Sequence, residues 1–166
     1  MRNELTPFLA TAIAITVLEI VVFADANGAP TDGPPVLVEV SIDQSKANEV
    51  YLNVHFTSHL TNSISLYEGS LPWRHWQSII LVAARPGHDG EVLENVFPLD
   101  NPGPSVFVMK PGSEVQGRIP LHTHFPTLVK SLTEEDIILF WSYELVCTDG
   151  RRLPRVGGWL QLKRRT

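Results

Sequence analysis

Cysteine is almost absent from this sequence: Cys147 is the only one in 166 residues. A disulfide within the chain is therefore impossible, and the class of small domains held together by disulfides is excluded. Cys147 lies in an apolar stretch beside Leu145 and Val146, where we expect a small buried hydrophobic side chain rather than a reactive thiol. The fold has to depend on a hydrophobic core.

Recognisable catalytic motifs are also missing. The sequence contains no Gly-x-Ser-x-Gly turn, no His-Glu-x-x-His pattern and no glycine-rich phosphate-binding loop. Three consecutive carboxylates at residues 134–136 would project to different sides of the chain, so we interpret them as a solvated turn. We therefore expect that the protein is not an enzyme.

Basic residues are fewer than acidic ones. Lys and Arg number 13 against 18 Asp and Glu, which gives a formal net charge of −5. This acidic balance argues against a nucleic-acid partner. The basic residues gather near the C-terminus, beginning with Arg151 and Arg152. Such a cluster fits a solvated edge hairpin whose charges discourage aggregation, and a docking patch is the alternative.

Only one long apolar run is present, and it lies near the N-terminus. Residues 6–24 are largely apolar, and Ala24-Asp25-Ala26 has the small-x-small pattern of a signal-peptidase site. We expect residues 1–26 to be a signal peptide, which implies an extracytoplasmic protein, periplasmic or secreted. Glu19 interrupts the run, and an uncleaved N-terminal anchor is the alternative; otherwise we expect no membrane insertion.

The remainder of the chain has the composition of a globular β protein. Residues 27–35 are rich in proline and glycine and predict a linker, so a single folded domain is expected over residues 36–166. Residues 36–43 and 49–58 alternate between apolar and polar side chains and predict an antiparallel pair of strands. Further strands are expected at 64–67, 78–84, 92–99, 106–109 and 115–121.

Residues 135–162 predict a hairpin of two long strands. The first strand alternates, with one side formed by Leu139, Trp141, Tyr143, Leu145 and Cys147 and the other by Phe140, Ser142, Glu144 and Val146. Asp149-Gly150 supplies the turn. On the returning strand the inward candidates are Val156, Trp159 and Leu162, and Gly157-Gly158 predicts a bulge or a close backbone approach.

Seven to nine short strands separated by turns predict an all-β antiparallel sandwich. The stretch at residues 62–66, the Pro111-Gly112-Ser113-Glu114 turn and a strand-F analogue at residues 136–143 resemble an immunoglobulin-like domain. Over residues 36–163 the layout is also similar to accessory β domains of deuterolysin-type metallopeptidases and to secreted proteinase-inhibitor domains. This resemblance implies a fold only: the antibody-type disulfide is absent, and no functional residue of these families is carried over.

One loop combines two tryptophans with basic side chains. Trp73, Arg74, His75 and Trp76 lie together, and exposed aromatics with arginine are typical of surfaces that contact proteins or glycans. With Arg151 and Arg152, these four are the candidate partner-binding residues. The alternative is that the rings fold down onto the core.

His122 and His124 form the candidate metal site. In an extended segment, residues at i and i+2 point to the same side, which is a spacing used by metal ligands on strands. His55, His59 or Glu94 could complete such a site, and exposed histidines at a strand end are the alternative.

We therefore expect an exported, non-catalytic domain that binds an unidentified protein or glycan and uses no cofactor. The alternative is a periplasmic metal-binding or metal-delivery protein that binds copper or zinc through His122 and His124.

Overall fold

The computed structural model describes residues 34–97, 103 and 105–165, so the predicted signal peptide and most of the predicted linker lie outside the described residues. The described part forms nine strands: β1 (Val36–Asp43), β2 (Tyr51–Ser58), β3 (Ile64–Tyr67), β4 (Ile79–Arg85), β5 (Glu91–Val92), β6 (Val106–Met109), β7 (Glu114–Pro120), β8 (Ile137–Tyr143) and β9 (Val156–Leu162). Two short helices, α1 (Leu121–His124) and α2 (Leu128–Glu134), separate β7 from β8, and 3-10 turns lie at Glu68–Ser70 and Pro86–His88.

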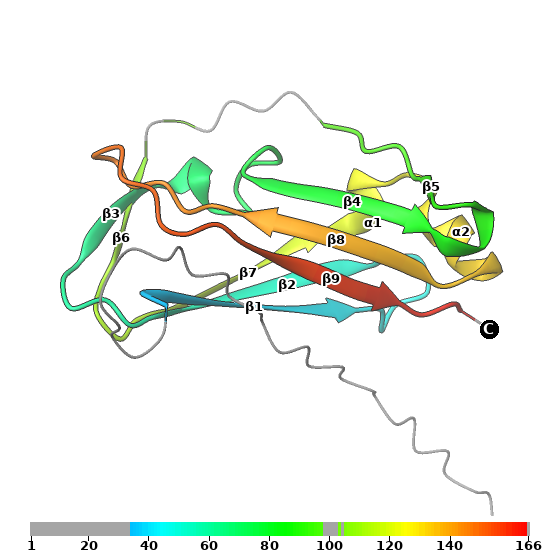
Figure 1. Cartoon of the computed structure of the whole chain (residues 1–166), viewed down its shortest axis with the longest axis horizontal. Helices are drawn as coiled ribbons and strands as arrows, with labels where there is room; N and C mark the ends of the chain where they lie inside the picture. The colour runs from blue at the N-terminus through cyan, green and yellow to red at the C-terminus, as the bar shows by residue number, and fades with distance from the viewer. Residues whose placement is uncertain (1–33, 98–102, 104, 166) are drawn as a thin grey trace, which may run out of the picture.

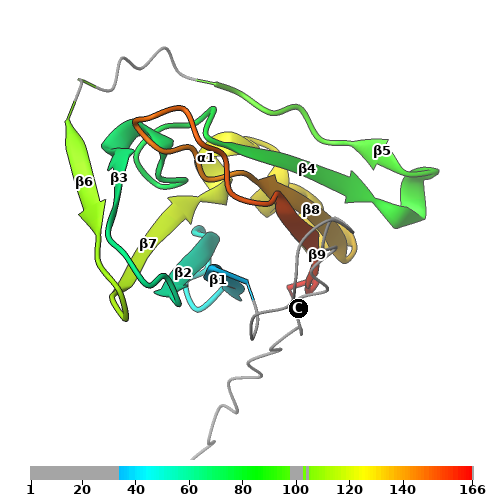
Figure 2. The same cartoon turned by 60° about the vertical axis from the view of Figure 1, so that its left-hand side comes forward.

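Two antiparallel sheets form the body of the domain. One has the order β1-β2-β7 and the other β5-β4-β8-β9. Figure 1 shows β4, β8 and β9 running side by side. The remaining pair, β3-β6, lies along one side of the sandwich, as Figure 2 shows.

The strand order confirms the predicted all-β sandwich. β8 lies between β4 and β9, as strand F lies between C and G of an immunoglobulin-like domain. The expected pair of residues 36–43 and 49–58 is β1 with β2, joined in the register Val36↔Ser58 to Asp43↔Tyr51.

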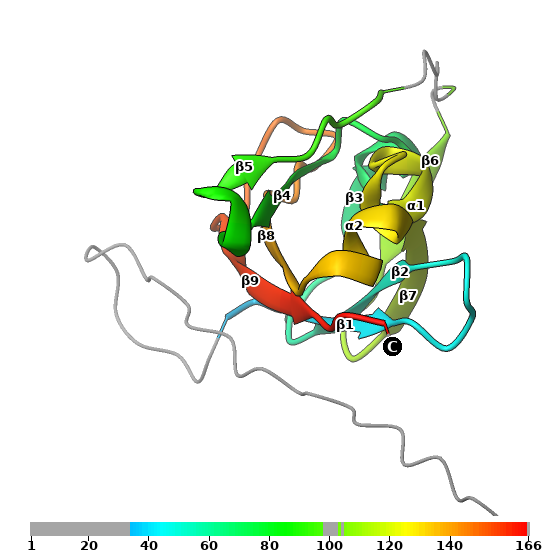
Figure 3. The same ribbon diagram turned by 90° about the vertical axis from the view of Figure 1, so that its right-hand side faces the viewer.

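The core fills the space between the sheets because each strand turns its apolar side inward. Leu52, Val54 and Phe56 of β2 are fully buried, while the residues between them face solvent. From the opposite sheet, Tyr143 stacks on Phe56 with ring centroids 5.4 Å apart. Figure 3, viewed along the long axis of the domain, shows the two sheets on opposite sides of this core and α2 at its end.

The C-terminal hairpin forms as expected, but one residue points the other way. β8 and β9 pair from Ile137↔Leu162 to Tyr143↔Val156 without a bulge. The prediction that Trp159 faces inward is wrong, since Trp159 is 50% exposed. Val156, Leu160 and Leu162 are buried, and strict alternation then places Trp159 on the outer side.

One expected strand is much shorter than predicted. The strand expected at 92–99 is reduced to β5, because the side chain of Asn95 rather than a backbone amide donates to the carbonyl of Leu81. The strands expected at 106–109 and 115–121 form as β6 and β7, and β6 pairs with β3 while β7 pairs with β2. Among the residues described, no helix is long and apolar enough to cross a membrane.

Candidate functional site

The outer side of sheet β5-β4-β8-β9 is apolar although it faces solvent. We call this surface the outer face and define it by three rows of residues that are paired across β4, β8 and β9: Ala84–Ile138–Gln161, Val82–Phe140–Trp159 and Ile80–Ser142–Gly157. Only Ser142 and Gln161 among these nine are polar. An apolar, solvent-facing sheet surface is unusual, because antiparallel sheets normally place polar side chains on that side.

Phe140 and Trp159 form the centre of the outer face. They are directly opposite each other in the β8–β9 register, and their exposed fractions are 47% and 50%. Ile80, in the next row, is 55% exposed. Large apolar side chains that meet solvent at neighbouring positions are a feature of protein contact surfaces.

The row beside this aromatic pair holds two small residues, Gly157 and Ser142. Gly157 cannot carry a side chain, since an added Cβ would lie 2.7 Å from the carbonyl oxygen of Trp141. Opposite it stands the small Ser142. Ser142 lines a groove of about 610 Å³ together with Tyr67, His75, Glu144 and Arg155, and the Arg155 guanidinium lies 3.4 Å from the Ser142 hydroxyl.

Charged clusters of opposite sign lie at two corners of the outer face. At the end next to Ser142, Arg152 and Arg155 both contact the Glu144 carboxylate, at 2.6 and 3.3 Å. Two guanidinium groups thus share one carboxylate. This end has a local excess of positive charge.

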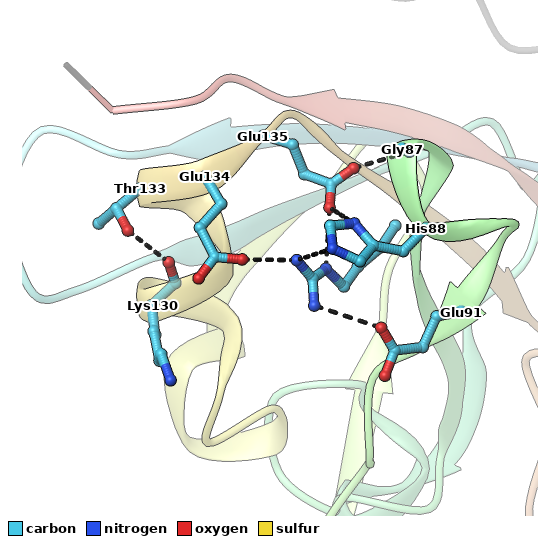
Figure 4. A network of polar contacts seen from close by, with 8 residues as sticks. Gly87, His88, Glu91, Lys130, Thr133, Glu134 and Glu135 are labelled. Carbon is cyan, nitrogen blue, oxygen red and sulfur yellow. Dashed lines mark hydrogen bonds and ion pairs between the residues drawn. The ribbon is translucent and has the colours of Figure 1, made fainter.

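The opposite end, where β4 meets β5 and α2, has an excess of negative charge. The Arg85 guanidinium contacts the carboxylates of Glu91, Glu134 and Glu135, at 3.2, 2.6 and 2.9 Å (Figure 4). Partial burial by itself would raise the pKa of Glu135, but hydrogen bonds donated by the Gly87 amide, Arg85 and His88 outweigh it and keep that pKa below its usual value. The Glu135 carboxylate therefore stays charged at neutral pH.

The two predicted tryptophans of the 73–76 loop are packed against the domain rather than free. Trp73 is half-buried, lies against Phe56 with ring centroids 5.3 Å apart and covers Gly117. Trp76 lies on the ring of His124, with centroids 4.0 Å apart. Their rings follow the alternative interpretation, in which the loop covers the core.

Among the other predicted partner-binding residues, the three arginines are exposed and His75 is partly buried, and the structure brings two of the four to the edge of the outer face. His75 lines the groove, and Arg152 contacts Glu144 at the positive end. Arg74 is exposed within the loop. Arg151 lies in the β8–β9 connection and is paired with Asp149 at 2.7 Å.

The premise of the metal site is wrong. His122 and His124 lie in the helical turn α1 and not in an extended segment. Residues at i and i+2 of a helix point about 200° apart, so the two rings cannot share a ligand on the same side. The ring of His122 instead contacts the backbone of Val50, with Nδ1 3.1 Å from its carbonyl oxygen. No group of three or more His, Cys, Asp or Glu side chains suited to a metal ion occurs in the described ranges.

His124 is buried instead, with 2% of its surface exposed. Its Nδ1 has no hydrogen-bond partner, and the rings of Trp76 and Phe125 lie beside it. Burial lowers the pKa of His124 to about 4, because the charged imidazolium would lose its hydration. The ring is therefore neutral at physiological pH.

The outer face was not predicted from the sequence because strict alternation was not applied to two of its strands, at residues 78–84 and 156–162. Residues 78–84 form a continuous apolar run, which is typical of a strand buried on both sides. In fact Ile80 and Val82 face outward. Strict alternation from Val156 to Leu162 places Trp159 on the outer side of the sheet, and alternation along the preceding strand places Phe140 on that side too. The register of the two strands makes them neighbours.

The described part is thus an immunoglobulin-like β-sandwich with a solvent-facing apolar sheet. No protein-family model and no curated protein matches the chain. Among solved structures, the crystal structure of a protein named ApaA from Bordetella pertussis is similar, with a TM-score of 0.46 and 16% identity over 82% of this chain and 100% of that chain. A similarity of this size does not show a shared family or activity.

Proposed function

We propose that this protein is an exported, non-catalytic domain that binds a protein partner through the outer face. The single observation that supports this is the row of large apolar side chains, centred on Phe140 and Trp159, that faces solvent in regular register. Leaving such side chains in water is unfavourable, at about 25 cal/mol for each Å² of apolar surface. A partner that covers them recovers this free energy.

A protein fits the chemistry of the outer face better than a glycan. Glycan surfaces combine an aromatic ring with neighbouring groups that hydrogen-bond to hydroxyls, whereas the row through Phe140 offers only hydrocarbon and one indole N–H. The centres of protein interfaces are aromatic and poor in charge, and their rims are polar. The charged groups here, such as Arg155 and Glu91, lie at the two ends of the outer face.

Export is part of the proposal and rests on residues 1–26. The small-x-small pattern at Ala24-Asp25-Ala26 supports cleavage after Ala26. N-terminal sequencing of the protein recovered from the producing cells tests it. A mature protein that begins at Asn27 and fractionates outside the cytoplasm supports export, and a cytoplasmic protein with the intact start contradicts it.

Site-specific photo-crosslinking in the producing cells tests the binding surface. A photoreactive amino acid in place of Phe140 should give an adduct of protein mass. The matched control is the same amino acid at Gln116, an exposed position on the opposite, polar sheet. Equal adducts at the two positions, or none at Phe140, would contradict the proposal, and an adduct with carbohydrate would point to a glycan.

A further inference from the structure

We infer that β6 binds an extended segment of a partner protein on the side that faces away from β3, so that the segment adds to the β3-β6 pair as an antiparallel third strand. This surface belongs to a different pair of strands from the outer face, and the inference therefore goes beyond the proposed function. We call it the β6 edge and define it by the backbone and side chains of Val106 and Val108.

The backbone of β6 carries hydrogen-bonding groups on both sides, and β3 uses only one of them. The Glu68 amide donates to the Ser105 carbonyl at 2.8 Å, and in an antiparallel pair the hydrogen-bonded positions alternate. Val106 and Val108 occupy the positions between, so their amides and carbonyls point away from β3. Among the described residues, no strand pairs with β6 on that side (Figure 2).

The opposite edge of the same pair shows how such backbone groups are satisfied. By the same alternation Ser65 of β3 points away from β6, and its carbonyl accepts a hydrogen bond from the Thr148 amide at 2.8 Å. Leu66 and Cys147 form an isolated bridge beside it. An extended chain thus already lies along β3. The backbone of the β6 edge is complementary to another extended chain, which is the basis of peptide recognition by strand addition.

The β6 edge also lacks the usual protection against strand pairing. Edge strands commonly carry charged residues or proline that discourage it. Such residues lie in β1 (Glu39 and Asp43), in β5 (Glu91) and in β7 (Glu114, Arg118 and Pro120). The end of β9 is bonded to the residue after β1, since Gln44 and Lys163 exchange two hydrogen bonds of 3.1 Å. β6, with the sequence Val-Phe-Val-Met, has neither charge nor proline.

The exposed side chains of this edge define the chemistry of the segment that fits it. Val106 and Val108 are 51% and 48% exposed, and Tyr67, opposite Val106, is 47% exposed. Lys110, two positions after Val108, is also exposed. An added strand therefore places β-branched side chains beside the two valines and an acidic side chain beside Lys110. In antiparallel pairing the segment has the order acidic-x-β-branched-x-β-branched.

Nuclear magnetic resonance titration of the isotope-labelled mature protein with a synthetic peptide tests the β6 edge. The probe is acetyl-Thr-Glu-Thr-Val-Thr-Val-Thr-amide, whose glutamate lies beside Lys110 in antiparallel pairing. We expect saturable chemical-shift changes at the amides of Val106 and Val108. Replacing the glutamate of the probe by lysine should weaken binding by about threefold, because like charges at opposite positions repel. No saturable change at these two amides overturns the inference.

Methylation of the probe's backbone separates strand pairing from contact between apolar side chains. Methyl groups on the amides of the two valines remove hydrogen bonds to β6 and should weaken binding by about tenfold or more. The matched control carries its methyl groups on the threonine before each valine, where the amides point away from β6, and it should bind as the unmodified probe does. Equal affinities of the two methylated probes overturn the inference.

A proline variant tests the same edge from the side of the protein. The Val108 amide points away from β3, so Val108→Pro removes a group that only an added strand uses, and proline is tolerated at such positions. This variant should lose the probe, whereas the control Val108→Thr keeps the amide and the β-branched shape and should retain it. Unchanged binding to Val108→Pro overturns the inference. A wild-type dimer that Val108→Pro dissociates, without binding of the probe, also overturns it and identifies a second copy as the occupant.

Discussion

Glu135 joins two distant parts of the chain through Arg85. Its carboxylate accepts a hydrogen bond from Arg85 Nε at 2.9 Å and another from the Gly87 amide at 2.7 Å. His88 Nδ1 lies 2.5 Å from the same carboxylate. These contacts attach the end of β4 and the turn after it to the residue that follows α2. Glu135 therefore fixes the negative end of the outer face.

Replacing Glu135 should destabilise the domain more than replacing its neighbour Glu134. Glu135→Gln removes the charge that Arg85 and His88 share, and the side chain of Glu135 is only 16% exposed, whereas that of Glu134 is 46% exposed. Solvent screens the exposed pair more strongly. Thermal unfolding monitored by circular dichroism should give a lower midpoint for Glu135→Gln than for Glu134→Gln. Equal midpoints would contradict a special role for Glu135.

The buried ring of His124 predicts acid sensitivity. Its pKa is lowered by burial from 6.5 to about 4, so between these values the unfolded chain binds a proton that the folded chain does not. Stability contributed by the neutral ring is therefore full above pH 6.5 and falls as the pH decreases toward 4. The accumulated loss is about 3 kcal/mol, at 1.36 kcal/mol for each pKa unit.

His124→Phe isolates this effect because phenylalanine keeps a ring against Trp76 without a titrating nitrogen. Urea unfolding of both proteins between pH 7 and pH 4 measures the difference. The wild type should lose about 3 kcal/mol more than the variant over this range. Parallel pH profiles for the two proteins would show that the ring is already solvated.

The contact between Gly117 and Trp73 leaves no room for a side chain. A Cβ at Gly117 would overlap the indole ring, so Gly117→Ala should destabilise the domain by about 1–3 kcal/mol in urea unfolding. Gly103→Ala is the control, since a Cβ there has no neighbour within 4 Å. Combining Gly117→Ala with Trp73→Leu should cost less than the sum of the single changes, and strict additivity would contradict the contact.

The two tryptophans of the hairpin should differ sharply in their contribution to stability. Trp141→Ala removes a side chain that is 4% exposed and should cost about 3–5 kcal/mol. Trp159→Ala removes only a cross-strand neighbour of Phe140 and should cost no more than about 1 kcal/mol. Urea unfolding at low protein concentration, where association is negligible, compares them. Similar costs would mean that Trp159 belongs to the core.

Much of the fold followed from local patterns. Strict alternation predicted β1 with the observed bounds of 36–43 and placed Leu52, Val54 and Phe56 of β2 inward. Burial on one face of a strand imposes this period, so the pattern can be found without knowing the partner strand. The alternation from Leu139 to Cys147 likewise predicted buried side chains, and all five residues on that side are buried.

The candidate site depended on relationships that the pattern does not contain. His122 and His124 were placed on one side because the segment was expected to be extended, and the helical turn α1 separates them. The sequence left open whether the tryptophans at 73 and 76 are exposed or fold onto the core, and they pack on Phe56 and His124, which are distant in the sequence. Contacts between remote residues require the tertiary structure.

By itself, the sequence determined that the chain forms an all-β sandwich without disulfides, because residue alternation and a single cysteine are local properties. Only the tertiary structure decided which apolar side chains remain in solvent. Phe140 and Trp159 lie 19 positions apart, and they become neighbours through the register of β8 and β9. No described strand covers that side of the sheet (Figure 3), so within the described residues both side chains face solvent.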